Sequence, residues 1–164
     1  MSARAVDLSP GAFSAILAAP FGRFGVRTNG ELIHELVFLP PATPVRAPDC
    51  ALAEQAVAQI SRWLDDPDRP FDLPLAERGT SFQRRVWAAI AAIPRGESRR
   101  YGSLAIELGS AARAVGQACG ANPFPLVVPC HRVVATSGLG GFAGATGGYL
   151  LDAKRWLLEF EAFK

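Results

Sequence analysis

A thiol and an imidazole stand side by side in the second half of the chain, in the run Pro129-Cys130-His131-Arg132. Cysteine is a strong nucleophile only as its thiolate, and a neighbouring base or cation is the usual means of forming that anion at neutral pH. The apolar runs on both sides favour an extended segment, in which adjacent side chains point to opposite faces. Contact between Cys130 and His131 then requires a turn or a bridging water. Two interpretations of Cys130 stay open, an inert buried thiol and a nucleophile.

A helix-forming segment of small residues lies shortly before this motif. Its small positions are Ala112, Ala114, Gly116, Ala118 and Gly120. Glycine inside a helix costs about 1 kcal/mol relative to alanine, so two of them need a reason. One reason is close packing against another element, and Cys119 on this segment is interpreted as a packing residue. The other is close approach to a nucleic-acid groove, with Arg113 as the single long, charged probe.

The net charge of +2 conceals an uneven distribution along the chain. Residues 1–77 carry six Lys/Arg and ten Asp/Glu, a net charge of −4, whereas residues 78–164 carry eleven and five, a net charge of +6. A basic half is typical of a surface that faces a polyanion, and ordinary solvated surface explains it equally well. Candidates for phosphate contacts, which add affinity without sequence preference, are Arg84, Arg85, Arg95, Arg99 and Arg100.

Composition narrows the class of protein. The 164 residues suffice for one domain or two small ones. Three cysteines without a repeating spacing indicate neither a disulfide framework nor a zinc site, and a functional free cysteine fits a reducing compartment, so we expect the cytoplasm. No run approaches the roughly 18 apolar residues of a spanning helix, and the segment Met1–Asp7 lacks the apolar block of a signal peptide. We therefore expect no membrane partner.

Residues 1–77 read as a small α/β domain. Strands are predicted at 13–17, 24–28 and 32–38, and Asn29-Gly30 between the last two is a strong hairpin signal. Apolar residues then recur at helical spacing from Leu52 to Leu64. The pattern predicts antiparallel hairpins followed by one helix.

Residues 78–164 read as mostly helical. Thr80 with Gln83 predicts a capping box at the start of a helix, and Pro94 ends that helix. Two short helices, over 103–108 and from about Ala111, flank a break at Gly109 and have the outline of a helix-turn-helix. Strand-like residues surround Cys130, a glycine-rich loop spans 138–148, and a closing helix is predicted over 150–160.

These motifs together resemble one family, the O6-alkylguanine-DNA alkyltransferases. The resemblance covers almost all of residues 80–161 and rests on Phe82-Gln83, Val86-Trp87, Ile93-Pro94, Tyr101-Gly102, Arg113-Ala114-Val115-Gly116, Asn122-Pro123, Pro129-Cys130-His131-Arg132-Val133, Lys154, Leu157-Leu158 and Glu161. It implies an α/β fold in which a ribonuclease H-like N-terminal domain precedes a winged helix-turn-helix domain. It also implies a monomer that needs no cofactor and holds no metal.

The resemblance assigns chemical roles to five residues. Cys130 would accept the alkyl group, and His131 would act as a base through a water. Glu161 would hold the imidazole, as an acid orients the base in other nucleophilic triads. Asn122 would order the turn behind the thiol, and Tyr101 would help to rotate the nucleotide and donate a hydrogen bond as guanine leaves.

The resemblance also assigns the contacts with substrate. The partner would be double-stranded DNA that carries O6-alkylguanine, with O4-alkylthymine as a further candidate. The target atom cannot be reached inside a duplex, so the base must leave the stack, and Arg113 would fill the gap. The implied DNA contacts are Arg113, Ala114, Gly116, Arg99, Arg100 and Arg132. The implied substrate pocket is lined by Pro125, Val133, Phe142 and Ala143.

The chain departs from the family pattern at two places, and two other functions compete. The turn between Tyr101 and Arg113 is shorter than usual, and the loop after Phe142, which would border the alkyl pocket, is longer. A non-catalytic lesion-binding protein of the same fold would replace the acceptor cysteine, which is present here. A thiol hydrolase would release its product with water, and it has no need of a slim helix that begins with arginine.

Overall fold

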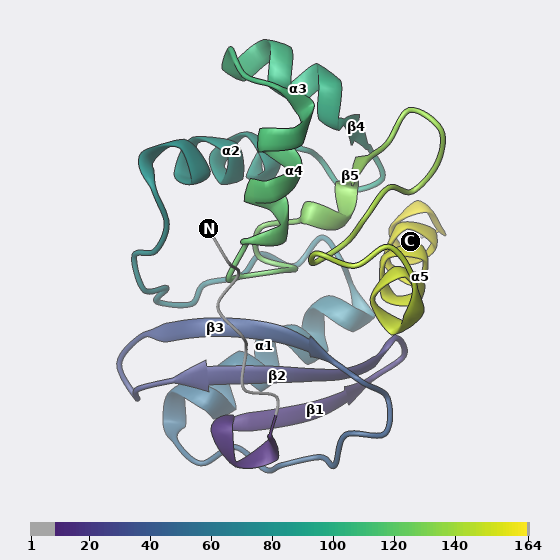
Figure 1. Cartoon of the computed structure of the whole chain (residues 1–164). Helices are drawn as coiled ribbons and strands as arrows, with labels where there is room; N and C mark the ends of the chain where they lie inside the picture. The colour runs from purple at the N-terminus through teal and green to yellow at the C-terminus, as the bar shows by residue number, and fades with distance from the viewer. Residues whose placement is uncertain (1–8, 164) are drawn as a thin grey trace.

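The N-terminal half of the computed structural model is a three-stranded antiparallel sheet backed by a helix (Figure 1). The structure describes residues 9–163; the segment Met1–Asp7 lies outside the described residues. After a 3-10 turn at Pro10–Ala12 (η1), the strands are β1 (Ala15–Ala19), β2 (Gly22–Thr28) and β3 (Ile33–Leu39), in the order β1-β2-β3. The predicted hairpins are confirmed, with ends shifted by one or two residues. The connection after β2 is longer than a two-residue turn, and the Asn29 side chain accepts hydrogen bonds from the N–H groups of Glu31 and Leu32.

Helix α1 (Ala51–Asp65) buries one face against this sheet. Leu52, Ala56, Ile60 and Trp63 recur every three or four residues, and all are buried. On the sheet, Phe24 lies opposite Phe38 across the β2–β3 pair, with ring centroids 5.0 Å apart. The helix predicted from its periodicity is thus confirmed, and its apolar face closes the N-terminal core.

The C-terminal half carries four helices around a short parallel strand pair. Helix α2 (Ser81–Ala91) begins at Thr80, which forms the predicted capping box with Gln83. Strand β4 (Arg99–Arg100) leads into α3 (Tyr101–Leu108), and Gly109 ends that helix in the left-handed conformation with φ 65°. Helix α4 (Ala112–Gly120) follows, then a 3-10 turn at Cys130–Arg132 (η2), and then β5 (Val133–Val134), which pairs with β4. Helix α5 (Gly148–Phe163) starts two residues earlier and ends later than predicted.

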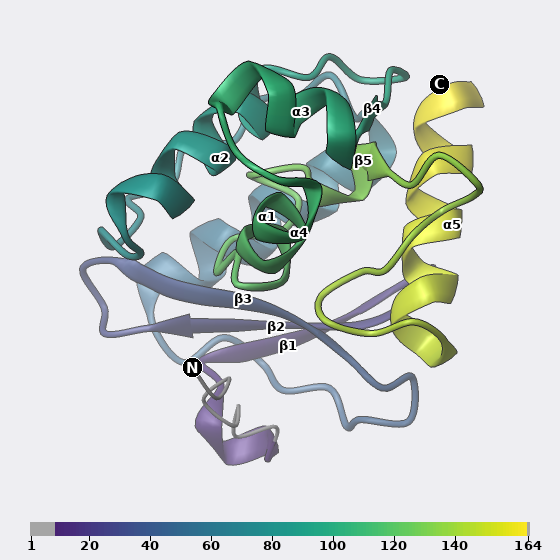
Figure 2. The same cartoon turned by 45° about the horizontal axis from the view of Figure 1, so that its top comes forward.

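The two halves share one apolar core. Figure 2 shows α4 above the sheet, with α5 along one side. Phe21 of the β1–β2 turn contacts Trp156 of α5, and Phe38 of β3 contacts Phe142, with ring centroids 5.7 and 5.2 Å apart. A backbone hydrogen bond of 2.8 Å also joins the Leu36 N–H to the Pro123 carbonyl. The α/β class is confirmed, and a domain boundary at residue 77 remains a prediction.

A search of the helices for membrane-crossing segments gave a negative result. Within residues 9–163, no helix combines the length and the apolar character that a bilayer span needs.

Candidate active site

The segment around Cys130 is folded, and the prediction of an extended segment is wrong at this point. Cys130, His131 and Arg132 form the η2 turn, in which the Arg132 N–H donates to the Pro129 carbonyl at 2.9 Å. Just before it, the Cys130 N–H donates to the Val128 carbonyl at 2.8 Å. Apolar runs favour a strand, but these local hydrogen bonds and the fixed φ of proline bend the chain here. The turn removes the alternation that would place Cys130 and His131 on opposite faces.

Asn122 organises the chain behind the thiol. Its Nδ2 atom donates to the Val128 carbonyl at 2.9 Å and to the Cys130 Sγ at 3.1 Å. Its Oδ1 atom accepts a hydrogen bond of 2.9 Å from the Phe124 N–H. One side chain therefore fixes both ends of the connection from α4 to Cys130, and it places a donor against the sulfur. A donor at this point stabilises a thiolate more than a neutral thiol.

The imidazole of His131 is completely enclosed. Its Nε2 atom lies 2.6 Å from the Glu161 Oε1 of α5, and both side chains are 1% exposed. Trp63 of α1 packs edge to face beside the ring, at 6.4 Å between centroids. The Nδ1 atom is buried and has no hydrogen-bond partner within the described residues. Burial lowers the pKa of His131, so the neutral imidazole prevails at neutral pH with Nε2–H donating to the carboxylate.

Arg132 shares the same carboxylate. Its Nε atom lies 3.1 Å from the Glu161 Oε1, its Nη2 atom binds the Glu161 Oε2, and its Nη1 atom donates to the Ile93 carbonyl at 2.7 Å. Burial raises the pKa of Glu161, but the hydrogen bonds from His131 and Arg132 outweigh it and hold the pKa at about 2. Arg132 was expected at the DNA surface. Its guanidinium is instead buried against Glu161, because α5 brings a carboxylate to it.

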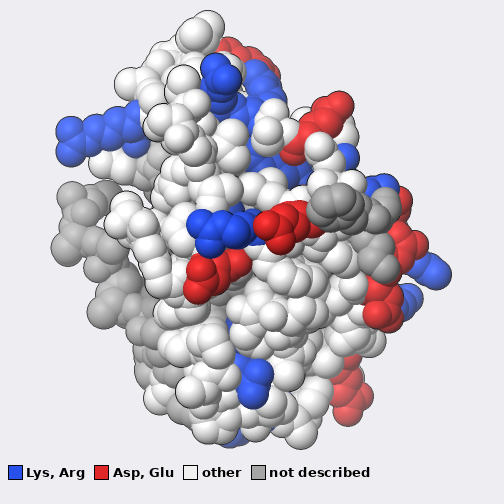
Figure 3. All heavy atoms as spheres, turned by 90° about the vertical axis from the view of Figure 1, so that its right-hand side faces the viewer, with Lys and Arg blue, Asp and Glu red and all other residues white. Residues whose placement is uncertain are grey.

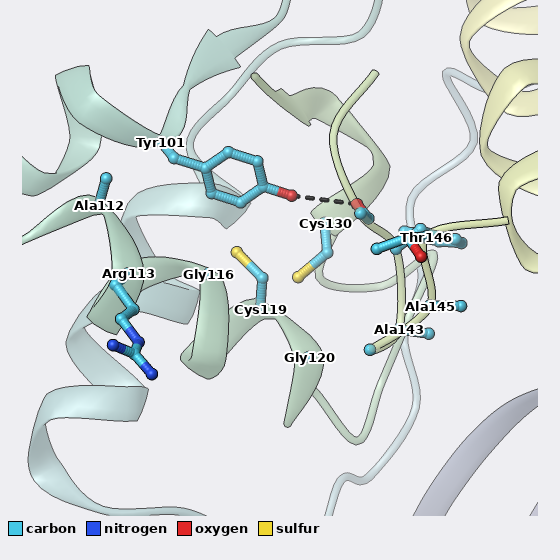
Figure 4. Close-up of a pocket in the computed structure, with 13 residues that line it drawn as sticks. Tyr101, Ala112, Arg113, Gly116, Cys119, Gly120, Cys130, Ala143, Ala145 and Thr146 are labelled. Atoms are coloured by element: carbon cyan, nitrogen blue, oxygen red, sulfur yellow. Dashed lines mark hydrogen bonds between the residues drawn. The ribbon is translucent and has the colours of Figure 1, made fainter. Parts of the chain in front are cut away.

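Cys130 opens into a cavity of about 440 Å³. Figure 4 shows the cavity between α4 and the loop that precedes α5. Its lining residues are Tyr101, Ala112, Arg113, Gly116, Cys119, Gly120, Cys130, Gly141, Phe142, Ala143, Gly144, Ala145 and Thr146. A concave site of this size that exposes a thiol is suited to a small planar ligand.

The cavity brings together six of the residues expected at the site. They are Tyr101, Arg113, Gly116, Cys130, Phe142 and Ala143. Pro125 and Val133, expected to line the pocket, are absent from the lining: Pro125 pairs with Val128, and Val133 is fully buried in β5.

Sequence reasoning missed Cys119 as a cavity residue. It lies three residues after Gly116 on α4, which is helical spacing, so the face marked by Gly116 would have identified it.

The loop between β5 and α5 is held from two sides. The buried ammonium of Lys154 donates to the carbonyls of Val133, Leu139 and Gly141 at 2.8, 2.5 and 2.9 Å. Tyr101 also donates to the Gly141 carbonyl, at 3.1 Å. Burial lowers the pKa of Lys154 to about 8, and burial raises the pKa of Tyr101 to about 12. Sequence analysis gave Lys154 no role, because its partners are backbone carbonyls, which leave no signature in the sequence.

The tip of this loop is a tight reverse turn at the cavity rim. Phe142 and Ala145 exchange two backbone hydrogen bonds of 2.9 Å, and the central residues Ala143 and Gly144 have φ values of 51° and 82°. Positive φ at both central positions defines a type I′ hairpin turn. A Cβ placed on Gly120 would lie 3.6 Å from the Gly144 nitrogen, so the end of α4 contacts this tip. The lengthened loop is therefore an ordered wall of the cavity.

The outer face of α4 is accessible. A Cβ placed on Gly116 would meet no atom within 4 Å, so packing does not require glycine there. Arg113 is exposed, and Figure 4 shows its guanidinium directed away from the two cysteines. Neither Arg100 nor Arg113 has an ion-pair partner within residues 9–163.

Most of the other candidate phosphate contacts are occupied. Arg84 pairs with Glu77, Arg95 with Asp68 and Arg99 with Glu107, and Arg85 donates to a backbone carbonyl. On the face that carries α5, Figure 3 shows acidic and basic side chains intermingled. The excess positive charge of the C-terminal half therefore does not form a basic patch on that face.

Comparison with known proteins indicates one family. Residues 81–163 match the family model described as 6-O-methylguanine DNA methyltransferase, DNA binding domain. The methylated-DNA–protein-cysteine methyltransferase of Mycolicibacterium paratuberculosis is 48% identical over 143 residues, covering 85% of this chain and 82% of that protein. The protein of the same name from Mycobacterium tuberculosis is 39% identical over 150 residues, covering 87% and 88%.

A solved structure of a relative has the same fold as this chain. The crystal structure of Mycobacterium tuberculosis OGT in complex with DNA superposes with a TM-score of 0.72 at 36% identity, covering 90% of this chain and 91% of that one. A match over the whole fold, together with a cysteine in a cavity beside a histidine–glutamate pair, places this chain in the methylated-DNA–protein-cysteine methyltransferase family.

Proposed function

We propose that this protein repairs O6-alkylguanine in duplex DNA by moving the alkyl group irreversibly onto its own Cys130. The observation that carries this proposal is the thiol at the wall of a nucleobase-sized cavity, in the same turn as His131, whose imidazole is buried against Glu161 of α5. The Cys130 sulfur attacks the alkyl carbon, an S–C bond forms, and the bond from carbon to O6 breaks. Guanine leaves as an anion and takes up a proton. The thioether is stable, so each molecule acts once.

His131 serves as the base in this proposal. Glu161 stays ionised because its pKa is about 2, and it fixes the proton of the neutral imidazole on Nε2. The Nδ1 atom, which is buried without a protein partner, then presents a lone pair that can take the thiol proton through one water. This step is needed because the hydrogen bond with Cys119, and burial, raise the pKa of Cys130. The Asn122 amide supports the thiolate once it forms.

DNA is held by α4 and the free arginines. The small, open face around Gly116 allows close approach to a groove, and exposed Arg113 is placed to occupy the gap left by an extruded base. Tyr101 remains protonated with its pKa near 12, so it can donate a hydrogen bond to the base inside the cavity when its hydroxyl turns from the Gly141 carbonyl. Arg100 adds a phosphate contact beside α3. O4-alkylthymine is a second candidate substrate, because it also carries an alkyl group on an exocyclic oxygen.

We further infer that the protein acts as a monomer in the cytoplasm. Duplex DNA is the partner, and single-turnover chemistry at Cys130 needs no second subunit. All three cysteines are free in the structure, which suits a reducing compartment.

A lesion-binding protein without chemistry is the competing function. It would use the same cavity and the same arginine, but it would have no use for a thiol beside a buried imidazole and carboxylate. The two functions differ in whether the protein gains mass from the lesion.

The deciding experiment is intact-protein mass spectrometry after incubation with a duplex that contains one O6-methylguanine. We expect a stoichiometric gain of one methylene unit, assigned by fragmentation to Cys130 and not to Cys119 in the shared tryptic peptide of residues 114–132. An unchanged mass with retained lesion binding would establish the non-catalytic function instead.

The matched variant is Cys130→Ala. The thiol is a reacting group and contributes little to holding DNA, so transfer should be abolished while DNA binding, measured by fluorescence anisotropy, stays within about threefold. The control Cys50→Ala alters a cysteine outside the cavity and should retain transfer. Loss of DNA binding in Cys130→Ala would contradict the assignment.

A further inference from the structure

The cavity holds a second thiol besides the proposed acceptor. Cys119 is the penultimate residue of α4 and Cys130 the first residue of η2, and both line the cavity. Figure 4 shows the Cys130 sulfur directed toward the side chain of Cys119. Cys119 is 8% exposed and Cys130 5%, and neither is in a disulfide. Alkyl transfer to Cys130 has no use for this second sulfur.

The two cysteines share a hydrogen-bonding neighbour. Asn122 bonds to both residues. Its backbone N–H donates to the Cys119 carbonyl at 3.2 Å, and its Nδ2 donates to the Cys130 Sγ at 3.1 Å. Because Asn122 ties the backbone of Cys119 to the side chain of Cys130 at the wall of one cavity, side-chain rotation at the end of α4 is the movement that would bring the sulfurs to a disulfide length of about 2.05 Å.

The charges around the pair favour one thiolate. The hydrogen bond from Cys130 lowers the pKa of Cys119 despite burial, and the nearby Lys154 ammonium adds to this effect. The same contact raises the pKa of Cys130. Cys119 is therefore the more thiolate-like member, and a thiolate is the form that reacts with an electrophilic oxygen.

We propose that Cys119 and Cys130 form a site of reversible oxidative modification, in which a peroxide joins them as a disulfide across the cavity. The Cys119 thiolate attacks one oxygen of hydrogen peroxide, an S–O bond forms, the O–O bond breaks, and hydroxide leaves to become water. Cys130 then attacks the Cys119 sulfur, the S–O bond breaks, and the second hydroxide leaves with the Cys130 proton as water. The two sulfurs together lose two electrons, and the peroxide is reduced to two waters.

The disulfide has two consequences for the cavity. It places a covalent bridge in the space that a base would enter, and it protects Cys130 from irreversible oxidation to sulfinic acid. The loss of alkyl transfer in the oxidised state rests on the function proposed above, whereas the disulfide itself does not. A thiol reductant such as dithiothreitol restores both sulfurs.

The test is peptide mapping of the full-length protein after treatment with equimolar hydrogen peroxide at neutral pH and capping of the remaining thiols. Trypsin leaves both cysteines in one peptide, residues 114–132, and chymotrypsin can cut between them after Leu126, because Pro125 blocks the bond after Phe124. We expect the tryptic peptide to lose two hydrogen atoms in mass, and the chymotryptic halves to stay joined until dithiothreitol is added. Both thiols capped separately, or a bridge that includes Cys50, would overturn the proposal.

Variants separate a specific pair from general oxidation. Cys50→Ser should leave the bridge unchanged. Cys119→Ser and Cys119→Ala should both prevent it, and with excess peroxide they should leave Cys130 as a sulfinic acid that dithiothreitol does not reverse. A reducible bridge that includes Cys130 in these variants would contradict the pairing. Methyl transfer is compared with that of the same variant before oxidation. A wild-type protein that forms the bridge but never transferred a methyl group would refute the proposed function and leave the disulfide standing.

Discussion

Glu161 positions two other side chains of the site. One buried carboxylate accepts hydrogen bonds from His131 and Arg132 and thereby fixes both the tautomer of the imidazole and the position of the guanidinium. The arginine keeps the carboxylate ionised, so the carboxylate stays available to the imidazole at any pH near neutrality. The expected DNA contact of Arg132 is thus replaced by an internal role.

Glu161→Gln tests this arrangement through the pH dependence of stability. The folded pKa of about 2 lies below the reference of 4.5, so the carboxylate stabilises the fold fully above about pH 4.5, and this contribution disappears as the pH falls toward 2. The contribution is on the order of 3 kcal/mol, since each pKa unit corresponds to about 1.4 kcal/mol. Urea unfolding between pH 6 and 3 should show this loss in the wild type and a much smaller loss in Glu161→Gln.

The matched control is Glu159→Gln, which changes an exposed carboxylate on the same helix. Its pH dependence should follow that of the wild type. Equal pH dependence in all three proteins would show that Glu161 titrates normally, and that His131 and Arg132 do not hold it ionised.

At the scale of elements, α4 buries one side in the core and leaves the other side accessible to a partner. Val115 and Ala118 are buried against the core, and Trp87 of α2 donates its indole N–H to the Ala118 carbonyl at 2.8 Å. The opposite side presents exposed Arg113 and Gln117, and Gly116 has open space beyond it. Of the two explanations for glycine in this helix, packing fails at Gly116, and at Gly120 an added Cβ would make only ordinary contact with the loop tip.

Gly116→Ala and Gly116→Leu separate folding from DNA binding. Neither side chain meets a neighbour near the Cβ, and both residues favour helix over glycine, so each should raise the free energy of unfolding by about 0.5–1 kcal/mol. The leucine should nevertheless weaken duplex binding at least tenfold, measured by anisotropy, because it fills the approach to the groove. Unchanged DNA binding by Gly116→Leu would remove α4 from the interface.

The loop before α5 is held by hydrogen bonds from the buried ammonium of Lys154. Lys154→Met should leave three carbonyls without their donor, cost about 1–3 kcal/mol of stability for each that stays buried, and increase amide hydrogen exchange over residues 139–145. Arg155→Met, one position along α5 and exposed, should change neither. Wild-type exchange in the loop of Lys154→Met would show that Tyr101 and the turn hold it alone.

At the scale of the whole molecule, the N-terminal half supports the chemistry of the C-terminal half. Trp63 of α1 encloses the His131 ring, and β3 holds the connection that carries Asn122 through the Leu36–Pro123 hydrogen bond. Arg84, Arg95 and Arg99 already pair with carboxylates. This leaves Arg100 and Arg113 as the arginines best placed to meet phosphate.

Salt dependence of DNA binding tests this charge distribution. A cation that contacts a phosphate displaces a counterion, so Arg100→Ala and Arg113→Ala should each reduce the slope of log affinity against log salt by about 1. Arg84→Ala is the control, because Glu77 already pairs with that guanidinium, and its slope should change less. An equal change in all three variants would indicate a diffuse electrostatic contact.

The sequence by itself determined the local structure and the family. Thr80 with Gln83, Asn29-Gly30 and the spacing of Leu52 to Leu64 act through nearby backbone groups and helical periodicity, so their effects follow from a few adjacent residues. The motif around Cys130 also predicted the reacting residues, because the proposed chemistry requires those residue types.

Only the tertiary structure decided what each side chain near the motif contacts. The structure differs from the sequence predictions in the turn at Cys130, the burial of Arg132 and the absence of Pro125 and Val133 from the cavity lining. It adds to them by placing Cys119 in the same cavity as Cys130. Glu161 meets His131 across 30 positions of the chain. Such contacts depend on how α4 and α5 dock, and docking is set by the sum of many core contacts, which no local pattern encodes.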